Sequence, residues 1–419
     1  MRLKSAEALV PKKKDDAHSV LESAFVFREL LAAFRRAGLV SEIRNALVVY
    51  IVATSRLLAK PLSLFIKGPS GVGKNFLADI VLRFFLRSEV MHLTSSSSKA
   101  WNYLNNALVH KIVYLKERNE LAGPVQPLRL MLSEGNLTHV VTVKKRGKLV
   151  SETRVTKGPV AAISTTTKER VEIDDETRQI SIWPDDTQEQ TARIIEAAVS
   201  QEVCIGPTEI KKWHRVQQLI QKRATLAIEF PDWLTQLAKY VNSQNLWVRR
   251  YFPAFLQACR TVALIRSFSR DGDTSAKRTK IRVCFSDYAV TSLIFNEVFE
   301  RSLDRADNEA YDTQRCVRRI SERKEGKAVR AGELAEELGI SDDRTYSLLR
   351  KAVSAGTVRT VNLSSRNNIK LYLPAKSSPF LPDPAEIFGK LEGVPETVEF
   401  VHPLTGKWVT YRRKSSETQ

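Results

Sequence analysis

The sequence predicts an α/β fold in which a parallel sheet carries helices on both faces and is followed by a helical segment and a small C-terminal domain. Three observations lead to this prediction. From Pro61 onward, short apolar strands alternate with helical patterns, as in a parallel sheet. A glycine-rich run follows the first strand, and a basic hairpin pattern interrupts the alternation. A chain of 419 residues is long enough for two or three domains of about 150 residues each.

The composition points to a polyanionic partner. Lys and Arg exceed Asp and Glu by 66 − 47 = +19, which favours nucleic acid over a membrane, although a merely well-solvated surface is the alternative. The four cysteines form no C-x-x-C pair and the six histidines stand singly, so neither a disulfide scaffold nor a zinc site is expected. No signal peptide and no apolar run of about 20 residues is present, so we expect a cytoplasmic protein without membrane contact.

The N-terminal unit, residues 1–60, is predicted to contain a polar tail over 1–17 and two helices. Apolar residues recur at helical spacing from Val20 to Phe34 and from Glu42 to Leu58. The next unit, 61–195, carries the sheet. Its strands are predicted at Leu62–Ile66, Val90–Thr94, Lys111–Leu115, Val160–Ser164 and Ile180–Trp183.

The strongest local signal is the spacing G-x-x-x-x-G-K between a predicted strand and a predicted helix. Glycines allow the backbone N–H groups to wrap around phosphates, the helix N-terminus adds positive charge, and the lysine reaches the β- and γ-phosphates. A Ser or Thr usually follows the lysine and binds magnesium, but here an Asn does, so the pattern supports ATP binding more strongly than hydrolysis. The predicted ATP-binding residues are Gly68, Pro69, Ser70, Gly71, Val72, Gly73, Lys74 and Asn75.

An ATPase of this kind also needs an acid on a neighbouring strand, to hold Mg²⁺ or to orient water. Glu117 at the end of strand 111–115 fits this role, as catalytic base and, with Asn75, as a ligand of Mg²⁺; Glu120 is the fallback, and a plain surface glutamate is the alternative. Lys116 stands where an aspartate usually precedes the glutamate. Strand 160–164 leads into three threonines, of which Thr166 is the candidate for positioning the attacking water, or else caps the loop.

Arg178 precedes the last predicted strand. A planar cation there suits an arginine finger offered to the γ-phosphate of a neighbouring subunit. The alternative is a local ion pair with Asp174 or Asp175.

Residues 138–155 have the pattern of a β-hairpin, with two β-rich arms around a turn at Gly147. Over 138–158 there are six basic residues and one acid, a net of +5. Such a tip suits sequence-independent contact with DNA phosphates, unless the hairpin is simply solvated. The candidate contacts are Lys144, Lys145, Arg146 and Lys148.

The C-terminal half is predicted to be a helical lid over 196–309, with 187–305 almost wholly helical, then a winged-helix domain over 310–376 and a docked or loose tail over 377–419. The winged helix follows from helical patterns at Thr313–Glu325, Gly332–Leu338 and Arg344–Ala355 and strand patterns at Thr357–Leu363 and Ile369–Leu373. Its surface could contact DNA or another protein. The candidate DNA contacts are Arg344, Arg350 and Arg366.

These residues together resemble a family. The run Glu42-x-Arg44-Asn45, the segment 55–62 before the glycine-rich run, the segment 132–137 and the threonines after strand 160–164 resemble AAA+ ATPases of bacterial mobile elements and phage-like islands. The layout is similar to MCM-type and superfamily III replicative helicases. The resemblance implies an AAA+ P-loop NTPase core with a pre-sensor hairpin lining the pore of a hexamer. It also implies ATP between subunits, Glu117 and Thr166 acting in cis, and Arg178 acting in trans. In the lid, it implies Arg249 or Arg250 as a second phosphate sensor.

We therefore expect an ATP-dependent DNA translocase or helicase of a mobile element, oligomeric, with a primase or polymerase as a further partner. Two alternatives stay open. One is an ATP-switched loader or regulator that oligomerises on DNA without unwinding it, and the other is a winged-helix repressor with a vestigial nucleotide fold.

Overall fold

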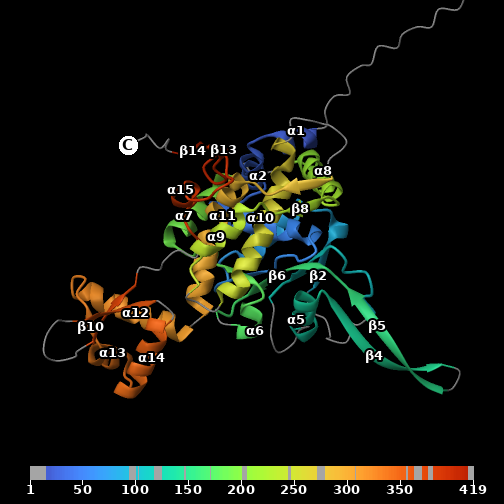
Figure 1. Ribbon diagram of the computed structural model, residues 1–419. Helices are drawn as coiled ribbons and strands as arrows, with labels where there is room; N and C mark the ends of the chain where they lie inside the picture. Colours follow the sequence, from blue (N-terminus) through green and yellow to red (C-terminus); the bar gives the residue numbers. More distant parts are fainter. Residues whose placement is uncertain are drawn as a thin grey trace, which may run out of the picture.

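The computed structural model describes a mixed α/β chain (Figure 1). The residues it describes are 16–93, 101, 103–117, 125–145, 148–169, 171–200, 205–243, 247–270, 279–306, 308–354, 357–362, 370–375 and 381–413.

A five-stranded parallel sheet lies at the centre of the molecule, in the order β2-β3-β6-β1-β7. All five strands coincide with predicted strands, because each contains a short apolar run; β1 and β6 are buried throughout, whereas β2 at the edge of the sheet is only partly buried. Strand β1 lies between β6 and β7, with Ile66 opposite Thr165 and Leu64 opposite Ile180. The strands are β1 (Leu64–Lys67), β2 (Val90–Leu93), β3 (Lys111–Leu115), β6 (Val160–Thr166) and β7 (Ile180–Ile182).

Alternate residues of β3 belong to two apolar cores. Ile112 and Tyr114 face the main core, whereas Val113 and Leu115 face a smaller one that α5 covers. The main core also contains side chains from the N-terminal helices, from the long helices α10 and α11, and from the C-terminal segment. The units expected at 1–60, 61–195 and 196–309 therefore share one core. Their helices are α1 (Asp16–Glu22), α2 (Val26–Arg36), α3 (Ile43–Thr54), α4 (Lys74–Leu82), α5 (Val125–Glu134), α6 (Ile173–Glu176), α7 (Gln188–Ser200), α8 (Pro207–Arg223), α9 (Trp233–Leu237), α10 (Val248–Arg270) and α11 (Phe285–Ala306).

One prediction for this region was incomplete. The segment expected to be almost wholly helical also contains two strands, β8 (Ala227–Glu229) and β9 (Lys280–Arg282), which pair in parallel. Each has only three residues, too few to show the alternation of apolar and polar residues that identifies a strand among the surrounding helical patterns.

The predicted hairpin is present as β4 (Asn136–Lys145) and β5 (Lys148–Lys157), which pair antiparallel along ten residues each. At about 3.4 Å per residue the ten-residue strands are about 34 Å long, and Figure 1 shows the hairpin extending away from the body. Its base depends on two glycines. Gly135 has φ +73°, and a Cβ on Gly158 would stand 2.6 Å from the Gly135 carbonyl oxygen. At the base of the hairpin, the segment that enters it at Gly135 and the segment that leaves it at Gly158 are therefore in direct backbone contact.

Residues 308–375 form a small module with a core of its own, separate from the main one. Three helices pack against a three-stranded antiparallel sheet in the order β10-β12-β11. These are the helices and strands that the sequence predicted, with β10 added. Their bounds are α12 (Asn308–Arg323), β10 (Val329–Arg330), α13 (Ala331–Leu338), α14 (Asp342–Ser354), β11 (Val358–Asn362) and β12 (Lys370–Pro374).

The chain then returns to the large body, where the segment 381–413 is docked. It consists of α15 (Pro384–Phe388) and a second hairpin, β13 (Thr397–Val401) with β14 (Trp408–Arg412). Leu381, Leu391 and Phe400 are buried in the main core.

Candidate functional site

The glycine-rich run forms a loop between the end of β1 and the start of α4. Gly68, Gly71 and Gly73 have φ values of +147°, +86° and +90°, which side chains rarely tolerate. Lys74 is the first residue of the helix, and its ammonium donates to the carbonyls of Gly68 (2.8 Å) and Pro69 (2.6 Å). Burial lowers the pKa of Lys74. The loop and helix N-terminus thus have the arrangement that binds phosphate groups.

Glu117 follows β3, which is separated from β1 by β6 in the sheet, and it meets side chains of α4 and β6 beside this loop. The Asn75 amide donates to a Glu117 carboxylate oxygen (3.3 Å), and the Thr165 hydroxyl donates to the Asn75 amide oxygen (2.7 Å). The backbone N–H of Glu117 donates in turn to that hydroxyl (2.8 Å). Lys116, at the position of the usual aspartate, instead forms an ion pair with Asp79 (2.8 Å).

The threonine in this cluster is Thr165 and not Thr166. The Thr166 side chain is buried, and its hydroxyl accepts from the backbone N–H of Lys168 (3.1 Å). Successive residues of a strand point to opposite faces, so only one of the two can face the loop. The structure therefore corrects the placement that we expected for Thr166.

The oxygen atoms of Asn75 and Glu117 suit a hard cation. Mg²⁺ is typically held by one or two carboxylates together with substrate phosphates and water, not by a cage of protein ligands. The donor set fits a magnesium ion carried with a nucleotide.

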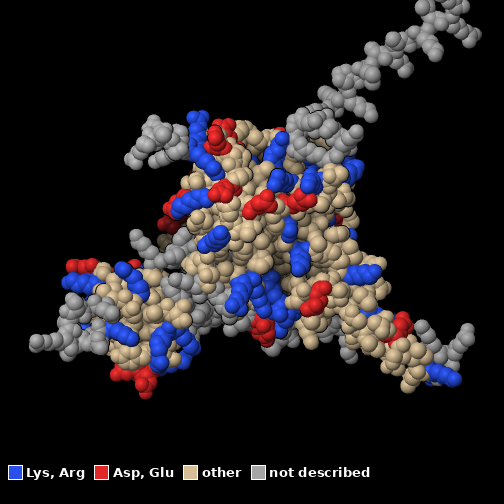
Figure 2. Space-filling view, viewed as in Figure 1, with Lys and Arg blue, Asp and Glu red and all other residues tan. Residues whose placement is uncertain are grey.

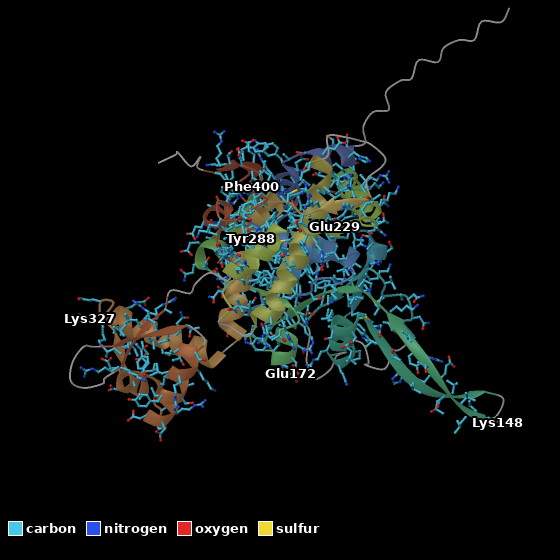
Figure 3. The ribbon with its side chains drawn as sticks, viewed as in Figure 1. Lys148, Glu172, Glu229, Tyr288, Lys327 and Phe400 are labelled. Atoms are coloured by element: carbon cyan, nitrogen blue, oxygen red, sulfur yellow. The ribbon has the colours of Figure 1, made fainter. Side chains whose placement is uncertain are left out.

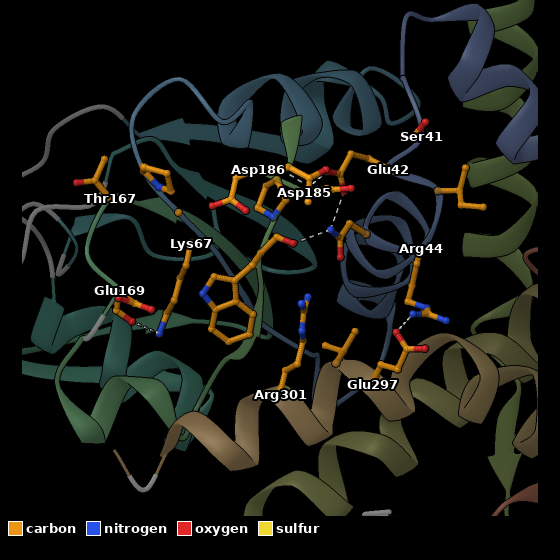
Figure 4. A pocket seen from close by; sticks show the side chains of 18 of the residues that line it. Ser41, Glu42, Arg44, Lys67, Thr167, Glu169, Asp185, Asp186, Glu297 and Arg301 are labelled. Atoms are coloured by element: carbon orange, nitrogen blue, oxygen red, sulfur yellow. Dashed lines mark hydrogen bonds and ion pairs between the residues drawn. The ribbon is translucent and has the colours of Figure 1, made fainter. Parts of the chain in front are cut away.

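A cavity of about 820 Å³ opens beside the first residues of the loop (Figure 4). Its walls come from the start of α3, the residues after β6 and β7, one side of α11, and the turn of the C-terminal hairpin. Glu42 lies at this wall, and burial raises the pKa of its carboxyl group. The Arg44 guanidinium forms an ion pair with Glu297 of α11, and both residues line the cavity.

Arg178 lies at the opposite end of β1. A second cavity of about 430 Å³ opens there, beside Ser63, which precedes β1, and Ile180, which begins β7. The Arg178 guanidinium donates to the Ser133 hydroxyl (2.8 Å) and stands 3.6 Å from Asp174. The local ion pair with Asp174 is therefore present within the single chain.

Arg250 lines the same second cavity and donates to the Thr177 hydroxyl. The described lining of this cavity includes four cations and no carboxylate: Lys60, Arg178, Arg249 and Arg250. Figure 2 shows basic side chains gathered over α6 and the adjacent part of α10. Arg250 thus lines the cavity at the amino-terminal end of β1 and not the cavity beside the phosphate loop of its own chain.

The candidate DNA contacts of the hairpin belong to its far end, whereas Arg154 and Lys157 lie toward its base. Lys144 and Lys148 are exposed, and Figure 3 shows Lys148 at the tip, away from the body. Lys145 ends β4, whereas Arg146 falls outside the described residues. Val140 and Leu149 are also exposed on this ribbon, at 62% and 76%.

In the small module, Arg344 and Arg350 lie on the exposed side of α14, together with Tyr346. The opposite side of α14 packs into the core of the module through Thr345, Leu349 and Ala352. Arg366 lies outside the described residues.

No protein-family model and no curated protein sequence matches the chain. Among solved structures, a full-length MCM homolog from Methanopyrus kandleri is similar with a TM-score of 0.41 and 11% identity, over 72% of this chain and 63% of that one. A structure titled as the active helicase Cch of SCCmec type IV has a TM-score of 0.36 and 11% identity, over 89% and 72% of the two chains. NtrX from Brucella abortus has a TM-score of 0.27 and 14% identity, over 78% and 71%.

These are distant, partial likenesses, and the chain spans less than two thirds of the length of the MCM homolog. Among the described residues, no helix has the length and apolar character needed to cross a bilayer.

The sequence did not single out the walls of the larger cavity as a site. The run Glu42-x-Arg44-Asn45 was noted only for its family resemblance, and the contributions of α11 and the C-terminal turn had no local signal. The carboxyl ends of β1 and β7 could have suggested the location, because ligands of parallel sheets bind at that edge.

Proposed function

We propose that this chain is an AAA+ ATPase that binds ATP with Mg²⁺ at the phosphate loop and acts on DNA as an oligomeric translocase or helicase. One observation carries the proposal: the phosphate loop and Arg178 lie at opposite ends of β1. A nucleotide held by the loop can meet Arg178 only if a second copy supplies it.

The two ends of the sheet are complementary in charge. The cavity beside the loop has five carboxylates and three cations in its lining, and the described lining of the opposite cavity has four cations and no carboxylate. A contact between two different surfaces of the same chain repeats head to tail and closes into a ring when the rotation permits. This supports a ring with ATP at each interface, and the hexamer of the resembled family is the expected size.

Each residue has a role that follows from its position. The loop N–H groups hold the phosphates, and Lys74 exchanges the carbonyls of Gly68 and Pro69 for phosphate oxygens. Glu117 accepts the proton of the attacking water, and Thr165 keeps Glu117 and Asn75 in place. The magnesium ion, when bound, supplies positive charge to the phosphates. Arg178, together with Arg250, offers cations to the neighbour's γ-phosphate.

DNA contact is assigned to the tip of the β4–β5 hairpin and to the small module, which we interpret as a winged helix. Lysines on an exposed ribbon suit sequence-independent contact with phosphates, and a helix with exposed arginines suits a groove. The hairpin takes the place of the pre-sensor hairpin of the resembled helicases. We place the protein in replication of a mobile element, in the cytoplasm, with a primase or polymerase as a further partner.

A mixing experiment tests the proposal. Arg178→Ala and Glu117→Gln should each abolish ATP hydrolysis while leaving ATP binding intact. When the two are mixed in equal amounts, about a quarter of the head-to-tail interfaces combine an intact Glu117 with an intact Arg178, and activity should return to that extent.

The matched control mixes Glu117→Gln with Lys74→Ala. Both changes damage the loop side of the interface, so no combination of these subunits is complete. If the first mixture stays as inactive as this control, the two residues do not act across an interface.

A second function is favoured by Asn75. Its amide stands where a hydroxyl usually holds Mg²⁺, and both ends of the amide are already hydrogen-bonded to Glu117 and Thr165. A slow ATP-switched loader that assembles on DNA without unwinding would tolerate this arrangement. Strand displacement on a forked duplex separates the two functions, since ATP-dependent binding without displacement identifies the loader.

A further inference from the structure

The segment 381–413, which follows the small module, is built into the large body. The Tyr288 hydroxyl donates to the Pro382 carbonyl (2.7 Å), and the backbone N–H of Glu392 donates to the side-chain oxygen of Gln236 (2.9 Å). The Phe285 and Phe388 rings pack with centroids 5.2 Å apart. Figure 3 shows Phe400 in the same part of the body as Tyr288. The segment is therefore fixed on α9 and α11 and is not a loose tail.

The turn of its hairpin reaches the cavity beside the phosphate loop. Leu404 is one of the lining residues, together with Gly68 and Pro69 of the loop and Val298 of α11. The C-terminal segment thus faces the same space that begins at the phosphate-binding backbone.

The turn that carries Leu404 is held by a neutral histidine. The backbone N–H groups of Leu404 and Thr405 both donate to His402 Nδ1, at 3.2 and 3.3 Å. Burial and the nearby charge of Arg44 lower the pKa of His402, which favours the neutral ring, and a neutral ring nitrogen can accept these two hydrogen bonds. Leu404 is therefore presented to the cavity in a fixed position.

The cavity has the size and the walls of a small-molecule site. Its volume of about 820 Å³ lies in the usual range of about 300–1,000 Å³ for ligand pockets. Gly68 and Pro69 of the loop line one end of this cavity, so a nucleotide with its phosphates at the loop would have this space beside it for the ribose and base. Ile43, Val298 and Leu404 supply apolar wall among the charged residues.

We propose that the C-terminal segment completes the nucleotide site, with Leu404 as the apolar wall at the base and ribose end. The inference rests on the proposed ATP binding and adds a binding residue far from the phosphate loop in sequence. Leu404 is a specificity element for the nucleoside and takes no part in phosphate contact.

The test compares ATP with inorganic tripolyphosphate, which offers the phosphates without the nucleoside. Binding of each to the full-length chain is measured by titration calorimetry. Deleting the segment is unsuitable because it removes buried residues of the main core, including Leu381 and Phe400. Leu404→Ala instead removes part of one side chain and should weaken ATP binding about threefold to tenfold while leaving tripolyphosphate binding unchanged.

Two controls accompany this variant. Leu404→Met preserves an apolar side chain of similar volume and should bind ATP as the unaltered chain does. Lys407→Ala changes a residue of the same turn that lines, with Leu404, a second cavity beside Arg28 and Arg35. Lys407 does not line the cavity at the phosphate loop, so this change should affect neither ligand.

The outcomes separate the two proposals. Equal weakening of ATP and tripolyphosphate by Leu404→Ala, or no weakening of either, overturns the role of Leu404. The proposed ATP binding fails in a different way, if Lys74→Ala leaves the binding of both ligands unchanged.

Discussion

A buried ion pair next to the phosphate loop allows a quantitative test of the structure. Lys67 is the last residue of β1, and its ammonium pairs with the Glu176 carboxylate on α6. The two side chains are only 1% and 9% exposed. The Ser181 hydroxyl also donates to the Glu176 carboxylate (2.7 Å), so the acid is hydrogen-bonded as well as paired.

Glu176→Ala leaves the Lys67 ammonium buried without its counter-ion. Removing one partner of a buried pair typically costs about 3–5 kcal/mol, because the remaining charge keeps its desolvation penalty. An exposed pair is worth much less, about 0–1 kcal/mol. Arg36 and Glu209 offer the comparison, with a contact of 3.0 Å and side chains 52% and 21% exposed.

The assay is urea denaturation of Glu176→Ala and of the control Glu209→Ala, followed by far-UV circular dichroism. We expect a loss of several kcal/mol in the free energy of unfolding for the first and of less than about 1 kcal/mol for the second. Lys67→Met combined with Glu176→Gln should recover most of the loss, since no unpaired charge remains and Ser181 keeps an acceptor. If Glu176→Ala costs no more than Glu209→Ala, the pair is not buried as described.

Three further predictions concern the site and the DNA-binding elements. Thr165→Val should lower the ATPase rate about tenfold or more by releasing the loop cluster, whereas Thr166→Val, the neighbouring control, should change it little; equal effects would contradict the placement of Thr165. Lys144→Ala with Lys148→Ala should reduce the salt dependence of single-stranded DNA binding by about 1.4 in the log–log slope, and an unchanged slope would move the contact to the small module. The raised pKa of Glu42 means that its ionisation destabilises the folded state: the penalty is absent below the ordinary value of 4.5 and complete above the raised pKa. Glu42→Gln should therefore have a higher Tm than the unaltered chain at pH 8, with a difference that shrinks on acidification toward pH 4.5, and a difference independent of pH would rule this out.

The sheet and the phosphate loop could be predicted because their sequence signals are local. Strand β6 is buried along its whole length, and its first four residues, Val160 to Ile163, form an apolar run that is visible in the sequence. The loop requires glycine where φ is positive, as at Gly71 and Gly73, and that requirement is visible in the sequence itself.

The parts that could not be predicted depend on contacts between distant segments. Choosing Thr165 over Thr166 requires knowing which face of β6 each residue occupies, and adjacent threonines carry no such information. The position of Arg250 follows from the contact of α10 with Thr177, which lies 73 residues earlier in the chain. Leu404 reaches the cavity only because the chain returns to the body after the small module.

The small module is an insertion and not an appendage, because the chain on both sides of it belongs to the main core. On one side Leu303 of α11 is buried there, and on the other Leu381 is. Translation that stops anywhere inside the module would therefore also omit apolar residues that the large body needs.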